Sequence, residues 1–99
     1  MSTPNLRHVL QRNRAAILEI AKKHGAYNVR IFGSVARNEF HPERDIDFLV
    51  TMEEGRSLLD LTHLWLDLEG LLQCKVDVLT DGGISPYLEP EILKEAVPL

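Results

Sequence analysis

The chain has 99 residues, of which 44% are apolar and 26% charged, a composition typical of a single globular domain spanning residues 1–99. Its formal net charge of −4 argues against direct nucleic-acid binding through a broad basic surface. The single cysteine excludes an intramolecular disulfide, and no apolar run approaches the roughly 20 residues needed to span a bilayer, so we expect a cytoplasmic protein with no membrane contact.

The first predicted element is a long helix that begins at Thr3-Pro4 and ends at His24-Gly25. Threonine can cap a helix, proline is favoured at the first helical position, and glycine suits the residue after the last turn. Apolar residues recur between these two points at helical spacing, namely Leu6, Val9, Leu10, Ile17, Ile20 and Ala21. This spacing predicts one amphipathic helix.

Two short strands follow, separated by a polar connection. Val29–Phe32 predicts a strand that ends at Gly33-Ser34, and Asp45–Val50 predicts a second strand with charges at its start. The segment Val35–Glu43 between them is polar and predicts a short helical turn followed by a loop. Its length leaves parallel and antiparallel pairing of the two strands open.

The remaining elements are a helix capped by Ser57, a third strand at Val76–Leu79 and a short last helix opened by Pro90. A leucine-rich stripe at three- and four-residue intervals indicates that the helix faces the core with Leu58, Leu61, Leu64, Trp65, Leu68 and Leu72. The order of elements predicts an α+β fold, in which a small mixed three-stranded sheet is packed with helices.

Acidic residues alternate with apolar residues on two of the predicted strands. Asp45 and Asp47 are two residues apart, so both project from one face while the apolar residues between and after them project to the core. Asp77 lies between two valines of the third strand and faces away from them. If the second and third strands are neighbours, the three carboxylates converge. A divalent cation would then relieve their repulsion, and hard oxygen ligands suit Mg²⁺.

Gly33 and Ser34 suggest a phosphate-binding turn at the end of the first strand. Glycine lets the backbone approach a phosphate closely, and amides at the start of a helical turn are ready donors to anions. Ser34 can add a hydroxyl, and Arg37 lies within reach of the same phosphates.

The run Ile31-Phe32-Gly33-Ser34-Val35-Ala36-Arg37, followed by Asp45-Ile46-Asp47-Phe48-Leu49-Val50, resembles the signature of the DNA polymerase beta-like nucleotidyltransferase superfamily. Specifically, it resembles the minimal nucleotidyltransferases, or MNT proteins, and Asp77 matches their third aspartate. The resemblance covers about residues 28–98 and implies the nucleotidyltransferase fold.

The resemblance also implies roles for the site residues. Gly33 and Ser34 would hold the triphosphate of ATP, and Arg37 would have a phosphate-binding or structural role. Asp45 and Asp47 would bind one or two Mg²⁺ ions. Asp77 would be a metal ligand or the general base toward the acceptor hydroxyl.

Two positions depart from the family pattern. Asn38 stands where the family often has glycine. Among the residues other than glycine, asparagine most readily adopts positive φ. Arg44 stands where the family often has serine, and its guanidinium could pair with Asp45 or reach a phosphate. Neither departure removes a carboxylate.

MNT proteins occur with a helical HEPN-domain partner in toxin–antitoxin modules, which implies a function and a partner for this chain. The implied activity is Mg²⁺-dependent transfer of AMP from ATP to a hydroxyl of the HEPN ribonuclease toxin. The chain would then be the antitoxin in a hetero-oligomer. The alternative is a non-catalytic binding module that blocks its partner sterically. Transfer to a small molecule such as an aminoglycoside fits the fold, but the sequence shows no additional substrate domain.

Overall fold

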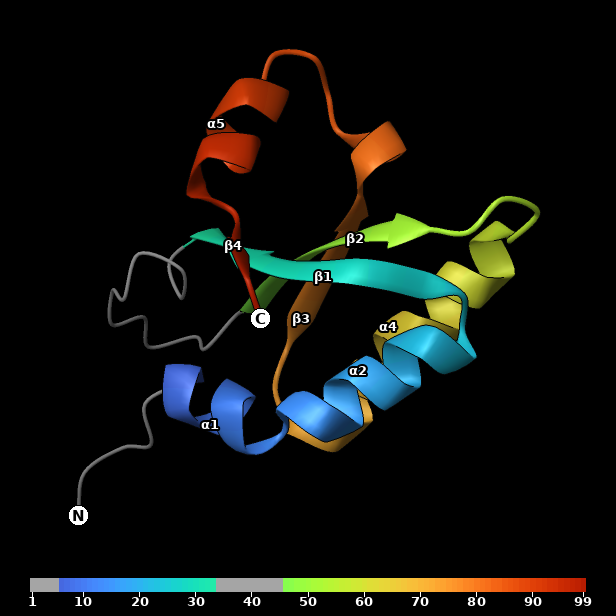
Figure 1. The fold of residues 1–99 in the computed structure, drawn as a ribbon, viewed down its shortest axis with the longest axis vertical. Helices are drawn as coiled ribbons and strands as arrows, with labels where there is room; N and C mark the ends of the chain where they lie inside the picture. The colour runs from blue at the N-terminus through green and yellow to red at the C-terminus, as the bar shows by residue number, and fades with distance from the viewer. Residues whose placement is uncertain (1–5, 34–45) are drawn as a thin grey trace.

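The computed structural model describes residues 6–33 and 46–99. Their elements, in chain order, are α1 (Leu6–Arg12), α2 (Arg14–Lys23), β1 (Ala26–Phe32), β2 (Ile46–Met52), α4 (Leu58–Leu72), β3 (Val76–Thr80), the 3-10 helix η1 (Asp81–Gly83), α5 (Glu89–Glu95) and β4 (Val97–Pro98). Figure 1 shows α1, α2 and α4 on one face of the sheet, with η1 and α5 on the other. None of these helices is long and apolar enough to cross a membrane.

The sheet has the strand order β3-β2-β1-β4. The β1–β2 pair is antiparallel and the β2–β3 pair is parallel, so the sheet is mixed, as the sequence predicts. It has four strands among the described residues where we expected three. The additional strand, β4, is only two residues long and pairs Val97 with Ile31. Such a segment is too short to show alternation, and Pro98 suits an edge position because it has no N–H to donate.

The larger core cluster fills the space between the sheet and the helices α2 and α4. Ile46, Phe48 and Val50 of β2 are at most 1% exposed, which confirms that they face the core. They pack in one cluster with Ile17 of α2 and Leu64 of α4. Burying an aliphatic or aromatic side chain stabilises the fold by about 1.5–3 kcal/mol, so this layer is the main source of stability.

The leucine stripe of α4 is core-facing except at its start. Leu64, Leu68 and Leu72 are buried, and Leu61 and Trp65 pack against the same cluster. Leu58 is 77% exposed, so its predicted core position is wrong. It lies in the first turn of α4, and the core cluster takes no residue of this helix before Leu61.

A second, smaller cluster lies on the opposite face of the sheet. Leu49 alternates with the core-facing residues of β2, so it points away from α2 and α4. It is buried together with Phe32 of β1, Ile84 after η1 and Ile92 of α5. This cluster seats the segment containing η1 and α5 on the sheet.

The first predicted helix is divided into α1 and α2 at Asn13. The Asn13 side chain donates through Nδ2 to the Val9 carbonyl at 2.8 Å, and the Asn13 backbone N–H donates to the same oxygen at 3.1 Å. Asparagine competes for backbone hydrogen bonds in this way, which explains the break. Thr3 and Pro4 lie outside the described residues. Gly25 follows the last turn of α2 with φ +79°, as predicted.

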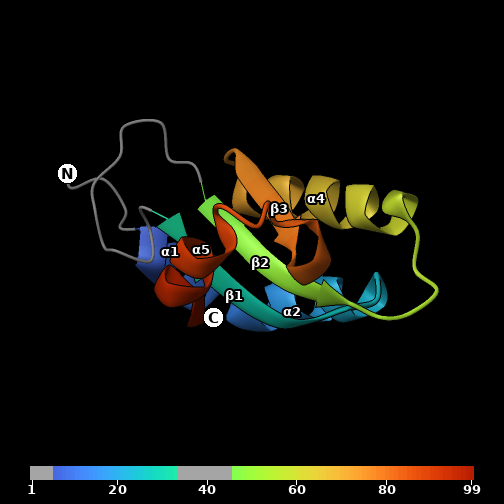
Figure 2. The ribbon, with the colours of Figure 1, turned by 90° about the horizontal axis from the view of Figure 1, so that it is seen from above.

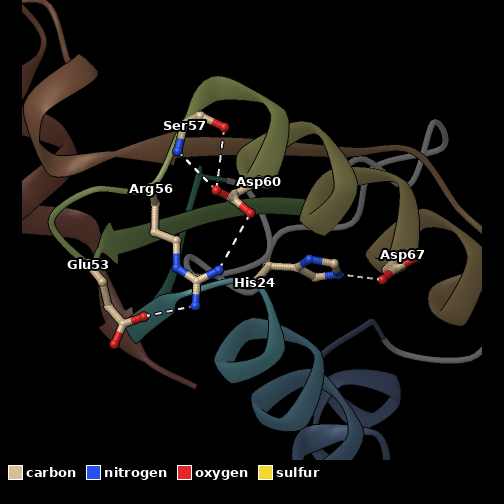
Figure 3. Close-up of polar contacts among 6 residues, drawn as sticks. All are labelled: His24, Glu53, Arg56, Ser57, Asp60 and Asp67. Atoms are coloured by element: carbon tan, nitrogen blue, oxygen red, sulfur yellow. Dashed lines mark hydrogen bonds and ion pairs between the residues drawn. The ribbon is translucent and has the colours of Figure 1, made fainter.

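Polar contacts anchor α4 to the end of β2 and to α2, as Figure 3 shows. Asp60 accepts hydrogen bonds from the Ser57 backbone N–H at 2.9 Å and from the Ser57 hydroxyl at 3.4 Å, which confirms Ser57 as the cap. Arg56 bridges Glu53 at 3.3 Å and Asp60 at 3.5 Å.

A second contact joins the end of α2 to the middle of α4. The Nε2 atom of His24 lies 2.6 Å from Oδ2 of Asp67, and the two are drawn together in Figure 3. The connection from β2 into α4 is therefore held by contacts within itself, and the middle of α4 is held to the end of α2.

Candidate active site

Two aspartates stand side by side where β2 and β3 begin. The parallel register pairs Asp47 with Asp77, and it pairs the preceding Ile46 with Val76. Ile46 and Val76 are buried against the helices, so the two aspartates project from the other face, on which Leu49 and Ile92 lie. Both aspartates are partly buried. The sequence left open whether these two strands are neighbours, and the structure shows that they are, with Asp47 and Asp77 on one face.

Gly33 completes this arrangement at the end of β1. Phe32 pairs with Asp47 across the antiparallel ladder, which brings the following glycine beside the carboxylate. Gly33 has φ +75°, a conformation that L side chains rarely adopt. A Cβ at this position would overlap with Oδ2 of Asp47. The backbone of Gly33 therefore lies directly against the Asp47 carboxylate, with no room for a side chain.

The mixed topology of the sheet is what brings these three points together. Because β2 and β3 are parallel, the start of one lies beside the start of the other. Because β1 and β2 are antiparallel, the end of β1 lies beside the start of β2. A strand end carrying a glycine and two strand starts carrying carboxylates thus meet at one edge of the sheet.

The other predicted site residues, Ser34, Arg37 and Asp45, lie outside the described residues, as do Asn38 and Arg44. In the part of the chain that the structure describes, no three His, Cys, Asp or Glu side chains gather as a metal site. That part supplies the pair Asp47 and Asp77. Two carboxylates on one face suit Mg²⁺, which takes one or two carboxylates together with substrate phosphates. The donor set therefore fits the predicted ion.

A polar network that the sequence did not reveal fixes η1 to the same face of the sheet. Arg30 of β1 donates to Asp81 Oδ1 at 2.5 Å, and the Thr51 hydroxyl of β2 donates to Asp81 Oδ2 at 2.5 Å. Partial burial raises the pKa of Asp81, but the hydrogen bonds from Thr51 and Arg30 outweigh it, so this pKa lies below its ordinary value. Strand alternation places Arg30 on this face, but no sequence pattern identifies Asp81 as its partner.

Comparisons with known proteins agree with this geometry. Residues 14–99 match the family described as the nucleotidyltransferase domain. A relative from Methanocaldococcus jannaschii, named "Putative protein adenylyltransferase MJ0435", is 52% identical over 81 residues, which cover 82% of this chain and 87% of the relative.

Solved structures show the same fold. One, described as a "putative minimal nucleotidyltransferase", is 46% identical, has a TM-score of 0.85 and is matched over 100% of both chains. A chain from a crystal structure described as a toxin–antitoxin with AMP-PNP has a TM-score of 0.73 at 19% identity, over 87% of this chain and 71% of that one. The second likeness concerns the fold alone.

Proposed function

The chain belongs to the nucleotidyltransferase family and is an enzyme of that class, and from this premise we propose that it transfers AMP from ATP to a hydroxyl of a partner protein. The observation that carries the proposal is the meeting of Gly33, Asp47 and Asp77 at one edge of the sheet. The naming of a 52% identical relative as a protein adenylyltransferase supports AMP as the transferred group and a protein as the acceptor.

In the proposed reaction, the acceptor oxygen forms a bond to the α-phosphorus of ATP while the bond from that phosphorus to the bridging oxygen of the β-phosphate breaks. Pyrophosphate leaves with the electrons of the broken bond, and the hydroxyl proton passes to a base. Asp45 and Asp47 would hold Mg²⁺, one ion or two, which would supply positive charge at the reacting phosphate. Asp77 has one of two roles in this scheme, either as a metal ligand or as the base that accepts the proton.

The backbone of Gly33 would hold the triphosphate together with Ser34 and Arg37. Gly33, with φ +75°, has no side chain that would keep a phosphate from its backbone. Because the same backbone lies against Asp47, phosphate and metal would be bound next to each other. This arrangement would set the α-phosphate between the carboxylates and the incoming hydroxyl.

For the acceptor, we propose a helical HEPN-type ribonuclease toxin, with this chain as its antitoxin in the cytoplasm. Support comes from the shared fold with a chain of a toxin–antitoxin structure that contains AMP-PNP. Adenylylation of the toxin would neutralise it, and the complex would be a hetero-oligomer.

The test is co-expression with the protein encoded by the neighbouring gene, followed by the intact mass of that protein. Wild type should add one or more AMP-sized increments, and Asp47→Asn should add none. Asp60→Asn is the matched control, because Asp60 lies at the start of α4 and carries no proposed catalytic role. It should modify the partner as wild type does.

The alternative is a binding module that blocks its partner without chemistry. The exposed side chains of Tyr87 and Leu88 favour such a contact surface. This alternative predicts a tight complex with no mass change, and full neutralisation by Asp47→Asn. Either result would contradict the transferase proposal.

A further inference from the structure

Most of the large exposed apolar side chains of the described residues belong to two segments. One is α4, where Leu58, Leu59 and Leu66 are exposed. The other is the segment that leads into α5 and along it, where Tyr87 is 93% exposed, Leu88 53% and Leu93 45%. We call Tyr87, Leu88 and Leu93 the α5 rim. Large apolar and aromatic side chains are enriched at the centre of protein interfaces, so a segment that exposes three of them is a candidate contact surface.

The α5 rim lies on the same face of the sheet as the candidate active site. Ile92, in the same helix, is buried in one cluster with Phe32, the residue before Gly33. The chain then continues into β4, where Val97 pairs with Ile31. Figure 2 shows α5 over the end of β1, on the side of the sheet turned away from α2.

The helix α4 lies on the other face of the sheet from α5 (Figure 1). Asp47 and Asp77 project away from α4, toward the face covered by η1 and α5. A protein bound across α4 would have the sheet between itself and the reacting phosphate, whereas one bound on the α5 rim would lie over the same face as the carboxylates.

Charge specifies the kind of surface that fits the α5 rim. Glu89 and Glu91 flank the apolar residues and are exposed, and Lys94 is the one cation of α5. Aromatic and apolar side chains form the centre of protein interfaces, and complementary charges at the edge steer the partner. The matching surface is therefore an apolar patch bordered by arginine or lysine.

We propose that the α5 rim is the docking surface for the acceptor protein, and that it binds an apolar, basic-edged patch near the hydroxyl that receives AMP. This inference rests on the proposed function and names the place where the acceptor is bound. The ion pair of Arg30 with Asp81 supports it, because it ties η1, at the start of the same segment, to the sheet. A docked acceptor would thus be held at a fixed distance from the aspartates.

The test compares two triple variants in AMP transfer to the neighbouring-gene protein at increasing concentrations of that protein. The rim variant is Tyr87→Ser/Leu88→Ser/Leu93→Ser, and the control is Leu58→Ser/Leu59→Ser/Leu66→Ser on α4. All six side chains are exposed, so both variants should fold. The rim variant should raise KM for the protein acceptor about tenfold or more, with ATP affinity unchanged, and the control should leave KM within about twofold.

A charge-reversal variant, Glu89→Lys/Glu91→Lys, keeps the apolar residues and tests the basic edge of the acceptor. It should raise KM at low salt, and the difference from wild type should shrink at high salt because screening weakens exposed charge pairs. A rim variant with unchanged KM, or a control that raises KM equally, would overturn the proposal.

Binding measurements separate this inference from the proposed function. If wild type binds the partner but never modifies it, the proposed activity is wrong. The Kd values of the same variants then still test whether the α5 rim binds the partner. Loss of binding in the rim variant alone would then support the docking surface. If wild type shows no binding at all, both proposals are wrong for this partner.

Discussion

Charged side chains are arranged differently at the two ends of the central strand β2, with opposite charges paired at one end and like charges adjacent at the other. Beyond its end, at the turn into α4, Arg56 lies between Glu53 and Asp60. At its start, the parallel register sets Asp47 beside Asp77, and the backbone of Gly33 lies against the Asp47 carboxylate. Like charges directly opposite each other in a sheet are destabilising, whereas opposite charges and satisfied caps stabilise.

The contrast separates the part of the sheet that stabilises the fold from the part that performs the proposed chemistry. At the far end, a substitution removes contacts and should lower stability without touching the reaction. At the site end, a substitution should lower activity by more than its effect on stability explains. This difference gives each of the following variants a different expected signature.

The largest effect is expected for Asp47→Asn. Loss of this carboxylate should lower the rate of AMP transfer about 10³-fold or more, because it removes a group that positions charge in the transition state. Asp47→Asn should also reduce the rise in thermal midpoint that Mg²⁺ produces in wild type, because a bound ion stabilises the folded state in proportion to its affinity. Retention of more than about a tenth of the activity would contradict the assigned role.

Gly33→Ala should lower both stability and transfer, and Gly55→Ala is its matched control. Both glycines have positive φ, +75° and +85°, so each substitution should destabilise the fold by about 1–2 kcal/mol through the backbone alone. A Cβ at Gly33 also meets Asp47, whereas a Cβ at Gly55 meets nothing within 4 Å.

Urea unfolding and transfer rates together test this pair. Gly33→Ala should lose more stability than Gly55→Ala, and it alone should lose activity. Equal activity in the two variants would show that the close approach of Gly33 to Asp47 has no part in the reaction.

Ser57→Ala should destabilise the fold by about 0.5–2 kcal/mol, the usual effect of removing a helix cap, and leave transfer per folded molecule unchanged. Chemical denaturation and a transfer assay well below the unfolding midpoint measure the two quantities. A loss of activity beyond the loss of folded protein would mean that the far end of β2 contributes to the reaction.

The smallest expected effect is a decrease in thermal stability at acidic pH. A backbone hydrogen bond from Ser57 lowers the pKa of Asp60, and a hydrogen bond with His24 lowers the pKa of Asp67, both from an ordinary 3.8. Groups with a lowered folded-state pKa stabilise the fold above their unfolded pKa, and this contribution is lost as the pH falls through the folded pKa.

The thermal midpoint of wild type should therefore be steady at about pH 6 and fall below about pH 4. Asp67→Asn should start with a lower midpoint at neutral pH and lose less on acidification, because the group that titrates is gone. Parallel curves for the two proteins would show that Asp67 contributes nothing to the acid sensitivity.

The sequence predicts the elements and the facing of the strands well, because alternation and capping are local properties. Asp47 and Asp77 could be assigned to one face from the valines and other apolar residues beside them. The break at Asn13 depends on one side chain competing for a carbonyl, which periodicity does not show. The strand β4 depends on a pairing between residues far apart in the chain, Ile31 and Val97.

For the candidate site as well, local features could be predicted from the sequence and long-range contacts could not. Alternation along the strands placed Asp47 and Asp77 on faces away from the core, but the adjacency of β2 and β3 and the direction of β1 against β2 had to come from the structure. So did the contact between Gly33 and Asp47, and the anchoring of Asp81 by Arg30. Each of these joins segments that are distant in sequence, and a single sequence contains no local signal for them.

The mixed sheet also determines at which stage of folding the candidate active site is assembled. Antiparallel β1 and β2 can pair early and already set Gly33 beside Asp47. The parallel neighbour β3 joins only after the chain has crossed over through α4, and loop-closure entropy makes such non-local pairing slow. A partly folded chain therefore lacks Asp77 at the edge of the sheet. The proposed AMP transfer should therefore require the β2–β3 pairing, and a chain that has not yet formed it should not modify other proteins.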